Sequence, residues 1–167
     1  MRSFSIFSIV IVALALFVPV APAVAETPAI DKLVVATGLK LDKAATAAVG
    51  KQAKTLAKSL ARLGKLVQKD APEATIRNQA EIVIGQLEQA IERAQTALDK
   101  ALAAAELKLD KLVAKNPQLE GEAAAALAEL ESRLGTAFST MDNALQAAID
   151  GLSAFANYVD PTPPVTP

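Results

Sequence analysis

The chain has 167 residues, 52% of them hydrophobic, with 17 basic and 18 acidic side chains and a formal net charge of −1. It contains no histidine, cysteine or tryptophan, so the commonest general base, a thiol nucleophile and the usual zinc ligands are missing. We therefore expect no enzyme activity, no catalytic residue, no metal and no cofactor. The slightly acidic balance and the scarcity of aromatic residues also argue against a nucleic-acid partner.

The first 25 residues have the pattern of a secretory signal peptide. Arg2 supplies a positive start, an apolar run follows over 4–18, and the small residues of Ala23-Val24-Ala25 fit a signal-peptidase site. The apolar run is about 15 residues long, shorter than the ~20 that a membrane-spanning helix needs. We expect residues 1–25 to be cleaved and the rest to be secreted to an extracellular location, without disulfides.

After this segment, composition and proline spacing predict an all-α fold. The chain is alanine-rich, and Leu, Lys, Glu and Gln, which are strong helix formers, fill most other positions. Proline is tolerated in the first turn of a helix but not in its interior. The helices are therefore separated by prolines that recur every 44 or 45 residues: Pro28, Pro72, Pro117 and Pro161. Because the turns are short, we expect a domain at 26–159 that forms an elongated, antiparallel up-down-up bundle of three long amphipathic helices at about 28–69, 71–115 and 118–159.

Two sequence patterns mark the turns between these helices. Asp70, Pro72 and Glu73 have the spacing of an N-cap, a first-turn proline and a capping-box glutamate. Lys115, with the following Asn116-Pro117, is typical of a basic last turn, a cap and a helix restart.

Glycines leave the number of helices open. A glycine in a helix interior costs about 0.5–1 kcal/mol relative to alanine, and Gly38 or Gly50 could split the first segment to give four or five helices. The last residues, 160–167, are rich in proline and threonine and are expected to form a disordered tail, with O-glycans on Thr162 and Thr166 as a further alternative.

Each helical segment carries one apolar stripe with steps of three and four residues, close to the coiled-coil repeat. These stripes are the predicted core: Val49, Ala53, Leu56, Leu60, Leu63 and Val67; then Ile84, Leu87, Ile91, Ala94, Leu98, Leu102, Ala105, Leu109 and Leu112; then Leu127, Leu130, Leu134, Ala137, Met141, Leu145, Ala148, Leu152, Phe155 and Val159. Alanine buries little area, so we expect a thin core that opens at low cost.

Charge is distributed unevenly along the chain. Residues 26–69 hold nine basic and three acidic side chains, whereas residue 70 onward holds seven basic and fifteen acidic ones. Six basic residues of the first helix follow helical spacing within an arc of about 80°: Lys51, Lys54, Lys58, Arg62, Lys65 and Lys69. We call these six the basic stripe.

The second helix carries an acidic stripe, also at helical spacing: Glu81, Glu88, Glu92, Asp99, Glu106 and Asp110. One hypothesis pairs the two stripes along adjacent helices. However, the basic stripe lies nearly opposite its own apolar stripe, which favours an outer, solvated face that is a candidate contact for an anionic surface.

One stretch resembles a known family. The run Lys115-Asn116-Pro117-Gln118-Leu119-Glu120-Gly121-Glu122-Ala123, preceded by the Glu-, Gln- and Ala-rich residues 86–100, resembles insect apolipophorin III. A weaker similarity is to fungal secreted proteins that bind hydrophobic surfaces. Either resemblance implies a cysteine-free bundle that opens and lays its apolar faces on lipid or another hydrophobic surface.

The leading hypothesis is a secreted, non-enzymatic bundle that binds lipid or amphiphilic surfaces reversibly through amphipathic helices. The alternative is a secreted structural or protein-interaction bundle with no lipid ligand, able to self-associate through its heptad stripes. A host-defence role shares the basic helix, but the acidic remainder of the chain argues against it.

Overall fold

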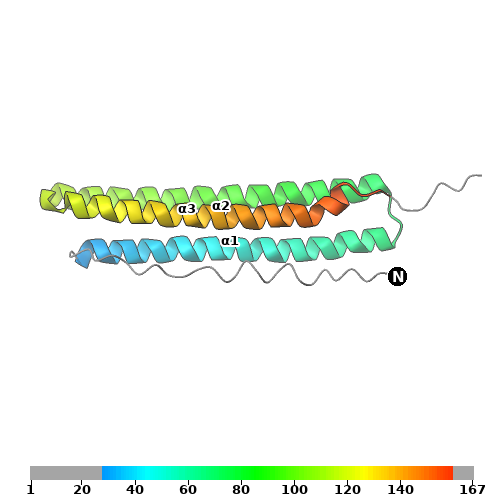
Figure 1. Cartoon of the computed structure of the whole chain (residues 1–167), viewed down its shortest axis with the longest axis horizontal. Helices are drawn as coiled ribbons and strands as arrows, with labels where there is room; N and C mark the ends of the chain where they lie inside the picture. The colour runs from blue at the N-terminus through cyan, green and yellow to red at the C-terminus, as the bar shows by residue number, and fades with distance from the viewer. Residues whose placement is uncertain (1–27, 160–167) are drawn as a thin grey trace, which may run out of the picture.

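The computed structural model describes residues 28–159, which form a slender rod of three long helices packed against one another (Figure 1). Helix α1 spans Pro28–Gln68, α2 spans Glu73–Lys115 and α3 spans Glu120–Ala156, and the short 3-10 helix η3, Pro117–Leu119, precedes α3. The expected all-α class and the three long helices are confirmed. The predicted signal peptide and the predicted tail at 160–167 lie outside the described residues.

The first helix is continuous. Gly38 and Gly50 both lie inside α1, so the alternative of four or five shorter helices is wrong for this part of the chain. With 41 residues and a rise of 1.5 Å per residue, α1 is about 60 Å long. Packing against two neighbouring helices along this length outweighs the local cost of the glycines inside α1.

The turn between α1 and α2 differs from the sequence prediction. Asp70 does not cap α2; it ends α1 in the left-handed conformation, with φ 53°. The N–H of Asp70 donates to the carbonyl of Val67 (3.1 Å), and the N–H of Ala71 donates to the carbonyl of Leu66 (3.1 Å). These two bonds form a Schellman C-cap, whose left-handed position aspartate tolerates better than most side chains.

Helix α2 therefore begins without a side-chain cap. Pro72 occupies the N-cap position, and its carbonyl accepts hydrogen bonds from the N–H groups of Thr75 and Ile76. The second turn agrees with its prediction, because Asn116 caps the end of α2 through its N–H. Its side chain also accepts a hydrogen bond from the backbone N–H of Gln118 in η3.

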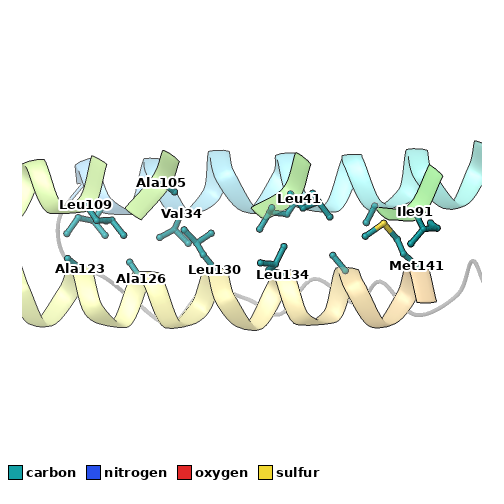
Figure 2. Close-up of a cluster of buried hydrophobic side chains, with 14 residues drawn as sticks. Val34, Leu41, Ile91, Ala105, Leu109, Ala123, Ala126, Leu130, Leu134 and Met141 are labelled. Carbon is teal, nitrogen blue, oxygen red and sulfur yellow. The ribbon is translucent and has the colours of Figure 1, made fainter. Parts of the chain in front are cut away.

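The core consists of two apolar clusters that follow one another along the rod. The larger cluster joins the first half of α1 to the second half of α2 and most of α3. Figure 2 shows its side chains filling the space between the helices, with Met141 of α3 directed toward Ile91 of α2. The smaller cluster includes Leu63, Leu87 and Leu152. Leu145 packs against both clusters and connects them.

The predicted apolar stripes of α2 and α3 are buried or half-buried, except Val159, which lies beyond the end of α3. The predicted stripe of α1 is wrong at one position, because Ala53 is exposed and Gln52 is buried in its place, whereas its other five residues are buried or half-buried. Gln52 follows Ala45 by seven residues, so it continues the buried face that the first half of α1 begins.

One ion-pair cluster joins α1 to α3. The half-buried Arg133 pairs with Glu129 of its own helix (2.9 Å) and with Asp42 of α1 (3.6 Å). Its side chain lies over Gly38, where a Cβ would stand 2.9 Å from the Nη1 of Arg133. Gly38 is therefore the glycine in α1 with a packing role, whereas the space beside Gly50 is open.

This contrast predicts unequal effects of alanine at the two glycines. Gly50→Ala should raise the free energy of unfolding by about 0.5–1 kcal/mol, because alanine restricts the unfolded chain and no atom obstructs its methyl group. Gly38→Ala should give a much smaller stabilisation, because the added methyl group displaces the Arg133 side chain from Asp42. Urea unfolding followed by circular dichroism measures both variants.

A double-mutant cycle provides the control. Removing the obstructing side chain with Arg133→Ala should restore the stabilising effect of Gly38→Ala to that of Gly50→Ala. Equal gains for the two glycine variants in the unmodified background would contradict a packing role for Gly38.

Candidate functional site

The basic stripe is exposed to solvent at every position, from Lys51 to Lys69. None of its six side chains makes an ion pair or a hydrogen bond within the described residues. The cause is the rotation of α1, which buries Leu41, Gln52 and Leu63 against the neighbouring helices and so turns the stripe outward. The structure thus places five of the six candidate residues on one outer face of α1 and the sixth, Lys69, in the turn that follows it.

The acidic stripe of α2 is also exposed at all six positions. No member of it forms an ion pair with the basic stripe in the part of the chain that the structure describes. The hypothesis that the two stripes neutralise each other along adjacent helices is therefore not supported by the geometry. Both stripes are therefore exposed for contact with another molecule.

The three helices differ strongly in charge. Helix α1 carries eight basic and two acidic residues, a net charge of +6, whereas α3 carries one basic and six acidic residues, a net charge of −5. The ion pair between them runs against this trend, since it joins Arg133, the one base of α3, to Asp42. The opposite charges of α1 and α3 therefore lie mainly on the outer surface, and the rod has a basic side.

Among the described residues, a few large apolar side chains are also exposed. Val35 and Leu39 lie one helical turn apart on α1, with 47% and 50% of their surface exposed. Ile82 and Leu107 of α2 are 45% and 55% exposed. Sequence reasoning missed Val35 and Leu39, because aliphatic residues in an apolar-rich segment resemble core residues until packing is known.

A groove of about 440 Å³ lies between the end of α2 and the start of α3. Apolar side chains make up most of its lining, and three carboxylates also contribute: Glu106, Asp110 and Glu120. These carboxylates repel anions, so the groove is a poor binding site for the anionic ligands that the basic stripe would attract. No cluster of acidic residues suited to a metal ion occurs within residues 28–159.

None of the three long helices is both long enough and apolar enough to cross a bilayer. The chain matches no known protein family, no curated protein and no solved structure. The function must therefore be inferred from the charge and burial of this chain alone.

Proposed function

We propose that this protein is a secreted, non-enzymatic, antiparallel up-down-up bundle that binds anionic lipid surfaces reversibly. The contact is the outer face of α1, with the basic stripe toward the lipid headgroups. The proposed secretion depends on the signal-peptide pattern of residues 1–25, and the resemblance to apolipophorin III is consistent with a lipid partner.

The observation that carries the proposal is that all six basic side chains are exposed and that none has a carboxylate partner within the described residues. Adjacent like charges along a helix repel by about 0.2–0.5 kcal/mol per pair. The stripe therefore gains no ion-pair stabilisation within the described residues. An anionic surface would relieve this repulsion and gain about 1 kcal/mol from each nearby basic residue.

The strength of such binding depends on salt. The stripe is solvent-exposed, so counter-ions screen it over a Debye length of about 8 Å at physiological ionic strength. We therefore expect tight binding at low salt and weaker binding at physiological salt, where the protein can also dissociate from the lipid surface.

Vesicle flotation of residues 26–167 tests this function. We expect co-flotation with phosphatidylglycerol-containing vesicles, reduced at physiological salt, and none with pure phosphatidylcholine vesicles. Equal flotation with both vesicle types would contradict an electrostatic contact and favour an opened bundle that inserts its apolar stripes. Absence of flotation with either would refute the lipid function.

The alternative is a structural or protein-interaction bundle with no lipid ligand. It is favoured by the exposed acidic stripe of α2, which is complementary in charge to the basic stripe and could receive it from a second copy. Sedimentation velocity distinguishes the two functions, since this alternative requires oligomers that grow with protein concentration and dissociate at high salt in the absence of vesicles.

A further inference from the structure

The outer face of α1 contains two large apolar side chains, Val35 and Leu39, that nothing within the described residues covers. They are spaced i, i+4, so they lie side by side on one face of the helix. They are the only large apolar residues of α1 with about half of their surface exposed, since the others contribute to the two core clusters. Half of each side chain is therefore in contact with water for no structural reason.

Three exposed lysines lie close to this pair along α1, on one side of it: Lys32, Lys40 and Lys43. Each lies within four residues of Val35 or Leu39, and none forms an ion pair within the described residues. A lysine can lay its apolar stem along a membrane surface while its ammonium group reaches the headgroups. The two carboxylates of α1 are both half-buried, and one of them, Asp42, already pairs with Arg133.

We propose that Val35 and Leu39 insert into an anionic bilayer while these lysines contact its headgroups, so that the closed bundle docks through α1. This inference rests on the proposed lipid function and adds the insertion residues and the closed state. Opening is unnecessary, because both anchors are exposed while the core is buried.

A bilayer fits this face better than a protein partner does. The lysine-bearing face extends from Lys32 to Lys69, which follows the end of α1, over a length of about 55 Å and without an exposed carboxylate. A planar anionic surface meets such a face along its whole length. The apolar pair borders this face near its start and gives it a point of insertion, in the manner of an interfacial amphipathic helix.

The test compares two double variants that remove similar apolar groups from different helices. We expect Val35→Ser with Leu39→Ser to weaken binding to phosphatidylglycerol-containing vesicles about tenfold or more. The matched control, Ile82→Ser with Leu107→Ser on α2, should change it less than about twofold. All four side chains are roughly half exposed, so both variants should remain folded.

A fluorescence measurement separates the closed state from an opened one. The chain has no cysteine, so Leu39→Cys and Leu107→Cys each accept a single environment-sensitive dye. Closed docking predicts a blue shift on vesicle addition for the label at 39 and none for the label at 107. Shifts at both positions would overturn closed docking.

The proposed lipid function and the proposed insertion site are refuted by different results. Flotation without a shift at position 39, or equal loss in both double variants, would refute the insertion site and leave the lipid function standing. Absence of flotation in the unmodified protein would refute both. Binding to polyglutamate but not to vesicles would replace the bilayer by an acidic protein partner.

Discussion

Replacing Gln52 with leucine should raise the free energy of unfolding by about 2–4 kcal/mol, the largest stabilisation that we expect from a single substitution. Only 3% of the surface of Gln52 is exposed, and neither its Nε2 nor its Oε1 has a hydrogen-bond partner within the described residues. A buried polar group without a partner loses its hydration and gains nothing in return. Leucine has a similar volume and removes this penalty.

The position of Gln52 explains why it matters to the whole rod. In α1 it lies between the residues of the larger cluster, which end at Val49, and those of the smaller cluster, which begin at Leu56. The amide therefore interrupts an otherwise apolar interior at the junction of the two clusters. We expect the bundle to separate first at this junction, because the amide regains its hydrogen bonds with water there.

Thermal and urea unfolding measure this effect. Gln52→Leu should raise the melting temperature by roughly 5–15 °C, and the urea midpoint should rise with little change in slope. The matched control is Gln89→Leu, the same chemical change at an exposed position of α2, which should alter stability by less than about 0.5 kcal/mol. Equal effects at the two positions would show that the amide of Gln52 is already satisfied in solution.

The same variant distinguishes two modes of lipid binding. If the bundle must open to bind, stabilising the closed state with Gln52→Leu weakens vesicle binding in proportion to the gain in stability. If the closed bundle docks through Val35 and Leu39, the variant binds vesicles as tightly as the unmodified protein.

The sequence was sufficient to predict the helices, because their determinants are local. Prolines and stripes with steps of three and four residues place the three helices within a few residues of their observed limits. Asp70 was assigned wrongly because aspartate both caps helix starts and tolerates the left-handed conformation, and only the geometry of the following turn selects between these roles.

The core of α1 was harder to predict than that of α2 or α3. Hydrophobicity favours Ala53 as a core residue, but the rotation set by Leu41 and Ala45 buries Gln52 instead. In the candidate site, too, the sequence predicts some exposures but not others. The exposure of the basic stripe could be predicted from its angle to the apolar residues, whereas the exposure of Val35 and Leu39 depends on which faces of α1 its neighbours cover.

The second large effect is expected when the centre of the basic stripe is neutralised. Lys54→Gln, Lys58→Gln and Arg62→Gln together should weaken binding to anionic vesicles about 100-fold at low salt, since each basic residue near such a surface contributes about 1 kcal/mol. The remaining binding should depend less on salt. Flotation or vesicle titration by fluorescence measures both changes.

Unfolding of this triple variant would not explain its weaker vesicle binding. The three side chains are exposed and lie four residues apart in sequence, so removing their charges relieves repulsion and leaves stability equal or slightly higher.

Loss of net charge is tested separately by changing three exposed lysines of α2 to glutamine: Lys100, Lys108 and Lys111. This control removes the same three charges from another helix. If it weakens binding as much as the stripe variant does, the protein responds to total charge and α1 has no special role; if it binds normally, the contact belongs to the outer face of α1.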